Sequence, residues 1–114
     1  MIAIILAGGK SSRMGNDKGV IAIGGKKMID IVIERVRDSK AEDFFIATST
    51  NAPMTRNYSK RKGYTVIETS GEGYHEDLRY LLTLYPEFVS IACDIPFLKG
   101  EHINALIDYY YENS

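Results

Sequence analysis

The sequence contains a single cysteine, Cys93, among its 114 residues. One cysteine cannot form a disulfide within the chain, and neither a second cysteine nor a histidine stands near it at the spacing of zinc ligands. The composition therefore excludes a disulfide framework and a zinc site built around Cys93. We expect this residue to be a small, buried side chain in a strand.

Long hydrophobic runs are missing as well. The chain begins with MIAIILAGG, whose apolar residues run directly into glycines and have no basic segment before them. A signal peptide needs a basic start, and a membrane-spanning helix needs roughly 20 apolar residues. We therefore expect neither of these segments, and a protein that stays in the cytoplasm.

Neither positive nor negative charge is in large excess. The chain has 14 Lys and Arg residues and 15 Asp and Glu residues, which give a net charge of −1. A chain without a broad basic surface is a poor match for nucleic acid, whose phosphates require many cations. A phosphate ligand would therefore have to be bound by a local group of cations. The basic segment SKRKG at 59–63 is expected to be the solvated C-terminal end of a helix, where the helix dipole favours cations.

The sequence does contain a regular alternation of β-rich runs and helical patterns. Hydrophobic residues make up 45% and charged residues 25%, the balance of a globular protein, and the length suits one domain spanning 1–114. Strands are predicted at four runs rich in β-branched and other apolar residues: 2–6, 43–49, 64–69 and 88–94. The first run is continuous and apolar, as in a buried parallel strand, and the fourth is also expected to be buried.

Helices are predicted between these strands and after the last one. The first lies within 26–39, the second begins at Pro53 and stops before Gly63, and the third ends at Pro86. Apolar residues at helical spacing predict the buried stripes of the first, third and fourth helices, namely Met28, Ile29, Val32, Ile33 and Val36, then Leu78, Leu81, Leu82 and Tyr85, then Ile103, Leu106, Ile107 and Tyr110.

Four βα units in succession predict an α/β fold, an open doubly wound, Rossmann-like sandwich with a mostly parallel sheet and helices on both faces. In such sheets, ligands bind at the carboxyl ends of the strands. The loops that we expect at this edge are 7–18, 48–53, 69–76 and 94–98.

The first of these loops, within LAGGKSSRMGNDK at 6–18, combines glycines with cations. Gly8 and Gly9 can present backbone N–H donors, Arg13 can hold two phosphate oxygens, and Lys18 can supply a point charge. Neither the Walker pattern nor the dinucleotide pattern G-x-G-x-x-G aligns with this segment. The loop therefore predicts a polyphosphate site of another kind, with an exposed glycine turn as the alternative.

The segment CDIPFL places Asp94 at the carboxyl end of the fourth predicted strand. A carboxylate there is costly unless a cation or hydrogen bonds satisfy it. Mg²⁺ held by one carboxylate and by phosphate oxygens fits this position. A residue that caps a helix or shapes the loop is the alternative reading of Asp94.

These two segments resemble the signature loop and the metal-binding segment of the MobA-like nucleotidyltransferases. Two further stretches, FIATSTNAPMTRNY and IETSGEGYHEDL, are similar to the archaeal guanylyltransferases that act on adenosylcobinamide phosphate. The resemblance covers nearly the whole chain. It implies the fold of the nucleotide-diphospho-sugar transferases and transfer of GMP from GTP to a phosphorylated acceptor with release of pyrophosphate. Molybdenum-cofactor and sugar-phosphate nucleotidyltransferases are the alternatives within the enzyme class.

The resemblance also implies roles for individual residues. The backbone of the first loop would cradle the nucleoside and its phosphates, through Leu6, Ala7, Gly8 and Gly9. Arg13 would hold the outer phosphates, Lys18 would stabilise charge around the α-phosphate, and Asp94 would bind Mg²⁺. A guanine pocket near the second and third strands would include Thr48, Asn51, Gly73 and Asp77.

Asp77 is the candidate for base selection, because a carboxylate that accepts from the guanine N1–H and amino group would stay unpaired opposite adenine. Asp77 or Glu76 could equally stabilise the start of the helix that follows. The implied chemistry requires no nucleophilic side chain. His75 and His102 are accordingly expected to be ordinary surface or helix-capping residues.

The sequence departs from the family pattern at its far end. Members generally continue with strands that build the acceptor site, whereas this sequence stops at Ser114. A naturally shortened protein, a fragment and a frameshifted gene all remain open, and so does a non-catalytic nucleotide-binding module. Because the aromatic residues at 109–111 would lose their cover, we expect a homo-oligomer built through the C-terminal region.

Overall fold

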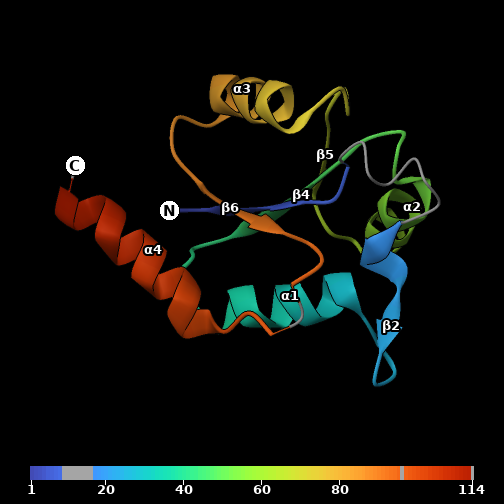
Figure 1. The fold of residues 1–114 in the computed structure, drawn as a ribbon, viewed down its shortest axis with the longest axis horizontal. Coiled ribbons are helices and arrows are strands. Elements are labelled where there is room, and N and C mark those ends of the chain that lie inside the picture. Colours follow the sequence, from blue (N-terminus) through green and yellow to red (C-terminus); the bar gives the residue numbers. More distant parts are fainter. Residues whose placement is uncertain (9–16, 96, 114) are drawn as a thin grey trace.

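The structure, a computed structural model, describes residues 1–8, 17–95 and 97–113. Its centre is a sheet of four parallel strands in the order β5-β4-β1-β6, which confirms the predicted parallel α/β fold (Figure 1). The strands are β1 (Ala3–Leu6), β4 (Phe44–Thr48), β5 (Val66–Glu68) and β6 (Val89–Ala92). The helices are α1 (Met28–Arg37), α2 (Pro53–Arg61), α3 (Tyr74–Leu84) and α4 (Gly100–Asn113).

The register brings the carboxyl ends of the strands to one edge of the sheet. Leu6 at the end of β1 pairs with Ala47 of β4 and with Ala92 of β6. The segments that follow β1, β4, β5 and β6 therefore begin side by side. We call this edge the rim, and it is where a ligand of a doubly wound sheet is expected.

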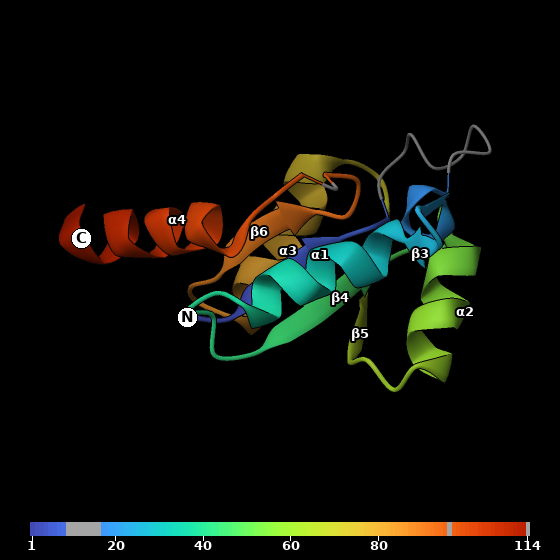
Figure 2. The ribbon, with the colours of Figure 1, turned by 90° about the horizontal axis from the view of Figure 1, so that it is seen from below.

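Side-chain alternation along β1 divides the core between two faces of the sheet. Ala3 and Ile5 belong to the larger cluster, which α1 and α4 cover, whereas Ile4 packs with Ala47 and Leu81 under α3. Figures 1 and 2 show α3 on one side of the sheet and α1 and α4 on the other. The predicted arrangement of helices on both faces is therefore confirmed.

Several predicted helix features are confirmed. In α1, four of the five predicted stripe residues are buried: Ile29, Val32, Ile33 and Val36. Pro53 occupies the first turn of α2, and Gly63 lies beyond its end with φ +81°, a conformation that glycine adopts without strain.

The predicted stripes of the two later helices are partly wrong. Leu82 of α3, and Leu106 and Tyr110 of α4, are exposed by 53%, 55% and 41%. In α3 the buried residues are Asp77 and Leu81, one narrow row. In α4 only Ile103 and Ile107 are buried, because the helix extends beyond the sheet (Figure 1).

A short helix and a β-hairpin between β1 and α1 were not predicted. The 3-10 helix η2 (Lys18–Val20) is followed by a hairpin of β2 (Ala22–Ile23) and β3 (Lys26–Lys27). Gly24 and Gly25, both with positive φ, form the turn of this hairpin. A Gly-Gly pair between two short strands is a known hairpin signal, so these residues could have revealed it.

No helix within the described ranges is long and apolar enough to cross a membrane.

Candidate functional site

The rim brings together Lys18 of η2 and Asp94, which follows β6. Lys18 Nζ lies 3.2 Å from Asp94 Oδ2, although the residues are 76 positions apart in the sequence. Their side chains are 43% and 35% exposed, so both groups can be reached from solvent. The predicted partners Gly9 and Arg13 lie outside the described residues.

The position of Lys18 is fixed by its neighbour Asp17. The Asp17 carboxylate accepts hydrogen bonds from the backbone N–H groups of Met54 and Thr55, at 2.8 and 3.2 Å, and from the Thr55 hydroxyl. Ala52, the residue before α2, offers no side-chain cap. Asp17 therefore caps α2 from a distant part of the chain and ties that helix to the segment that carries Lys18.

Close packing reinforces this junction. A Cβ added to Gly19 would lie 2.5 Å from Thr55 Oγ1, so a larger residue at this position would push η2 away from α2. The role of Asp17 was not predicted. The sequence could have indicated it, because the residue before Pro53 is an alanine without a side-chain acceptor. The capping acceptor of this helix must then come from another part of the chain.

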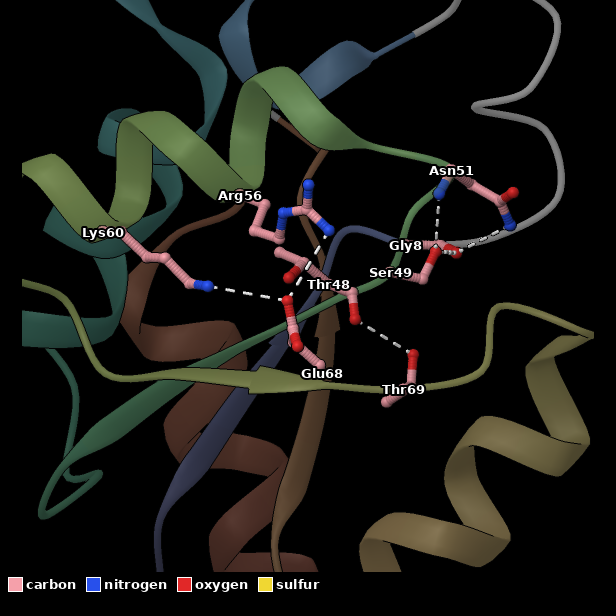
Figure 3. A network of polar contacts seen from close by, with 8 residues as sticks. All are labelled: Gly8, Thr48, Ser49, Asn51, Arg56, Lys60, Glu68 and Thr69. Atoms are coloured by element: carbon pink, nitrogen blue, oxygen red, sulfur yellow. Dashed lines mark hydrogen bonds and ion pairs between the residues drawn. The ribbon is translucent and has the colours of Figure 1, made fainter.

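A second polar network joins the loops after β1, β4 and β5 (Figure 3). Ser49 Oγ donates to the Gly8 carbonyl at 2.5 Å, and Asn51 Nδ2 donates to the carbonyls of Gly71 at 2.9 Å and Gly8 at 3.3 Å. The backbones of Gly8 and Ser49 are in close contact here, as shown by a Cβ added to Gly8, which would lie 2.5 Å from Ser49 N. Asn51 was predicted at this site, whereas Ser49 and Gly71 were missed.

Between β1, β4, β5 and α3 lies a small cavity of about 50 Å³, lined by Leu6, Gly8, Ala47, Thr69, Tyr74 and Asp77. Three of the predicted nucleoside-binding residues, Leu6, Gly8 and Asp77, thus face one space. A purine ring is larger than this cavity, whose wall includes the exposed side chain of Tyr74. Apolar walls with one carboxylate are the chemistry of a base-binding pocket.

Asp77 is buried and also shapes the neighbouring loop. Its Oδ1 accepts hydrogen bonds from Gly71 N at 3.1 Å and from Ser70 Oγ at 3.4 Å. These contacts fit the alternative reading, in which this carboxylate supports the start of α3. Gly73 lies directly before α3, where its carbonyl accepts from Asp77 N at 3.0 Å.

The side chain of Thr48 is not placed at this cavity. Ala47 packs toward α3, so Thr48, the next residue of the strand, points to the opposite face and is fully buried. Its carbonyl accepts from Thr69 N at 2.7 Å, and its hydroxyl has no hydrogen-bond partner in the described part of the chain. The backbone of Thr48, rather than its side chain, contributes to the rim.

Among the described residues, Cys93 is a buried thiol, and His75 and His102 are exposed imidazoles. Burial, together with the charges of Asp94 and Asp17, raises the pKa of the Cys93 thiol to about 12, so this buried group stays protonated. His102 Nδ1 accepts from Lys99 N at 3.2 Å at the start of α4, which confirms the expected capping role. His75 is exposed and its ring contacts Tyr74.

The donor set of the rim fits a magnesium ion only if the substrate supplies most of the ligands. Among the described residues, no group of three or more His, Cys, Asp or Glu side chains could hold a metal. Asp94 offers one accessible carboxylate, and Mg²⁺ is commonly bound through one or two carboxylates plus phosphate oxygens and water.

Two curated proteins are similar to this chain over most of its length. An adenosylcobinamide-phosphate guanylyltransferase of Methanocaldococcus jannaschii is 42% identical over 97% of this chain and 60% of its own length. A probable molybdenum cofactor guanylyltransferase of Natranaerobius thermophilus is 36% identical over 92% of this chain and 52% of its own length. The chain therefore spans little more than half the length of these relatives.

Two solved structures share the fold. A CMP:2-keto-3-deoxy-manno-octonic acid synthetase in complex with CTP superposes with a TM-score of 0.82 at 20% identity, over 98% of this chain and 47% of that one. A manganese complex of Rv0371c from Mycobacterium tuberculosis gives 0.68 at 15% identity, over 95% and 57%. At 20% and 15% identity, these two likenesses show a shared fold.

The family model of the MobA-like NTP transferase domain matches residues 3–114. Together with the glycine loop, the Lys18–Asp94 pair and the parallel sheet, this match shows that the chain belongs to the MobA-like NTP transferase family.

Proposed function

We propose that this chain binds GTP at the rim and takes part in the transfer of GMP to a phosphorylated acceptor, with adenosylcobinamide phosphate as the favoured acceptor. The observation that carries the proposal is the accessible Lys18–Asp94 pair beside the end of the glycine loop. The 42% identity to an adenosylcobinamide-phosphate guanylyltransferase supports this choice of acceptor. Because the chain spans 60% of that relative, the proposal concerns its nucleotide-binding part first.

In the proposed reaction, an acceptor phosphate oxygen attacks the α-phosphorus of GTP, and the bond to the β-phosphate breaks to release pyrophosphate. Lys18 would neutralise negative charge near the α-phosphate, and Arg13 would hold the outer phosphates. Asp94 would hold a divalent cation, proposed to be Mg²⁺, which supplies positive charge to the phosphate oxygens when bound. Asp77 would accept hydrogen bonds from guanine across the cavity mouth.

Two other functions are tested alongside this one. A molybdenum-cofactor guanylyltransferase is supported by the 36% identity to the Natranaerobius relative. A module that binds nucleotide without catalysing transfer needs the same rim and the same cavity. Both alternatives share the proposed nucleotide. The first differs in its acceptor, and the second has no acceptor.

The test is calorimetric titration with GTP, ATP and CTP, each with and without Mg²⁺. We expect binding that prefers GTP and strengthens with Mg²⁺. Release of pyrophosphate on addition of adenosylcobinamide phosphate would then identify the acceptor, and release only on addition of molybdopterin would favour the molybdenum-cofactor alternative. Binding without release with either acceptor would favour the non-catalytic module. A folded sample that binds none of the three nucleotides contradicts the proposal.

The chain is also proposed to associate with copies of itself through α4. Leu106, Tyr109, Tyr110 and Tyr111 are exposed by 55%, 68%, 41% and 52%, an apolar and aromatic surface of a kind that marks interfaces.

A further inference from the structure

A cavity of about 370 Å³ lies between η2, β3 and α2. It is lined by Val20, Lys27, Met54, Asn57, Tyr58 and Arg61. Figure 2 shows β3 beside α2, which places the two walls of the cavity next to each other. None of these six residues belongs to the proposed nucleotide site.

The lining is positively charged. Lys27 and Arg61 are cations, and none of the six described residues that form the lining is acidic. Within the described ranges, neither cation forms an ion pair. Lys27 Nζ lies 5.0 Å from the centre of the Tyr58 ring, and Lys62 Nζ lies 6.0 Å from the same ring. In a chain of net charge −1, this is a local concentration of positive charge.

Asp30, the carboxylate that contacts the lining residue Tyr58, is occupied by tyrosine hydroxyls. Asp30 accepts hydrogen bonds from the hydroxyls of Tyr58 and Tyr64, the latter at 2.8 Å. These bonds fix the Tyr58 ring as a rigid wall of the cavity. Asp30 is thereby engaged in joining α1 to α2 and to the residues before β5, and the cations remain available to an external anion.

The rest of the lining is suited to an organic group. Val20 and the exposed Met54 supply apolar surface, Tyr58 supplies a ring edge, and Asn57 supplies an amide. We propose that this cavity binds a small phosphate-bearing organic molecule, with Lys27 and Arg61 on the phosphate and the apolar wall on the organic group.

Occupancy of the cavity would act on the rim through a short path. Val20 is two residues after Lys18, and α2 is capped by Asp17. A ligand that bridges the Val20 wall to the Met54 wall holds together the two elements whose junction positions Lys18. The site is therefore inferred to strengthen nucleotide binding at the rim. This coupling rests on the proposed function, whereas binding to the cavity does not.

The binding test uses phenyl phosphate and inorganic phosphate as probes, followed by the backbone amide signals of Val20, Asn57 and Arg61 in NMR titrations. We expect both probes to shift these signals and phenyl phosphate to bind more tightly. Arg61→Gln should weaken phenyl phosphate binding on the order of tenfold, the loss of one charge-assisted hydrogen bond. Lys27→Gln should do the same and provides a second variant if one of the two does not fold.

The matched control is Lys60→Gln. Lys60 lies on the same helix and loses the same charge, but its Nζ lies 3.5 Å from Glu68 Oε1, outside the cavity (Figure 3). This variant should retain the affinity of the original protein. Signals that move only at rim residues, or equal weakening by Lys60→Gln and Arg61→Gln, overturn the site.

The coupling test repeats the GTP titration with phenyl phosphate present. We expect the GTP dissociation constant to fall several-fold in the original protein and to stay unchanged in Arg61→Gln. A GTP affinity that phenyl phosphate leaves unchanged overturns the coupling. Phenyl phosphate binding in a protein that binds no GTP overturns the proposed function but supports the cavity site.

Discussion

At the scale of single residues, the described part of the rim presents the Lys18 ammonium group to solvent. Lys18→Ala should weaken GTP binding by about 1.5–3 kcal/mol, the range for a hydrogen bond to a charged group. Calorimetric titration measures the change. Lys40→Ala is the control, because Lys40 also pairs with an aspartate, Asp108 at 2.9 Å, but in an exposed ion pair between the end of α1 and α4. Equal GTP affinity in the two variants would remove Lys18 from the site.

Two glycines with positive φ offer a second comparison at this scale. Gly71 has φ +70° and a Cβ there would lie 2.6 Å from both Asn51 Nδ2 and Ser49 Oγ, whereas Gly63 has φ +81° and open space around it. Gly63→Ala should cost about 1 kcal/mol from backbone strain alone. Gly71→Ala should cost about 2–4 kcal/mol, because the new methyl group also displaces the polar network. Urea unfolding measures both losses, and similar values would contradict the packing argument.

Residue chemistry explains which site residues could be predicted. Lys18, Asp94 and Gly8 stand in segments whose glycine and charge content indicates phosphate binding. Asp17 and Ser49 bond to backbone groups of segments far along the chain, and no local pattern records such partners. Thr48 failed as a side-chain candidate because strand alternation, set by the register, turns it away from the cavity.

At the scale of elements, α2 depends on a cap from outside the helix. Asp17→Ala should lower the free energy of unfolding by about 0.5–2 kcal/mol and speed amide exchange at Met54 and Thr55. Asp43→Ala is the control, since the Asp43 side chain accepts from the backbone N–H of the adjacent Phe44 at 2.8 Å and caps no helix. The capping role is refuted if exchange at Met54 and Thr55 is the same in both variants.

The joint between α1, α2 and the start of β5 should respond to alkaline pH. Burial and the hydrogen bonds to Asp30 raise the pKa of Tyr58 and of Tyr64 from 10.0 to about 12. The folded protein therefore keeps protons that the unfolded chain releases, and the free energy of unfolding should fall as the pH rises from 10 to 12.

Asp30→Asn should flatten this decline, because the negative charge that holds both protons is gone. Denaturant unfolding at several pH values measures the slope. Asp108→Asn removes a carboxylate that pairs with Lys40 instead of a tyrosine and should leave the slope unchanged. A decline of the same steepness in Asp30→Asn would show that the tyrosines do not depend on Asp30.

The elements themselves were largely predictable, and the exceptions have physical causes. Each predicted strand contains an observed one, because runs rich in β-branched and aromatic residues favour strands, even at the partly exposed edge strand β5. The helix stripes of α3 and α4 were predicted too wide, since helical spacing gives the apolar side of a helix but not how much of it reaches the sheet. Leu82 and Leu106 remain exposed for this reason.

At the scale of the whole molecule, the exposed row of α4 predicts self-association. Light scattering should give a mass above 12.8 kDa, that of a dimer or larger assembly. Tyr109→Asp should lower the measured mass. Tyr109 is 68% exposed, and an aspartate at this position would place a charge in the interface, which is unfavourable. Met54→Asp changes a similarly exposed apolar residue on α2 and should leave the measured mass unchanged. A single-chain mass at tens of micromolar contradicts this prediction.

The strand order also bears on how the protein is made. Of the sheet strands, β1 is synthesised first, yet it lies in the middle, where Ala3 pairs with Phe44 on one side and with Val89 on the other. While the ribosome is still adding the segments between β4 and β6, one edge of this apolar strand has no partner. An open apolar edge can pair with other chains. The nascent polypeptide therefore carries an unpaired apolar strand edge until β6 emerges.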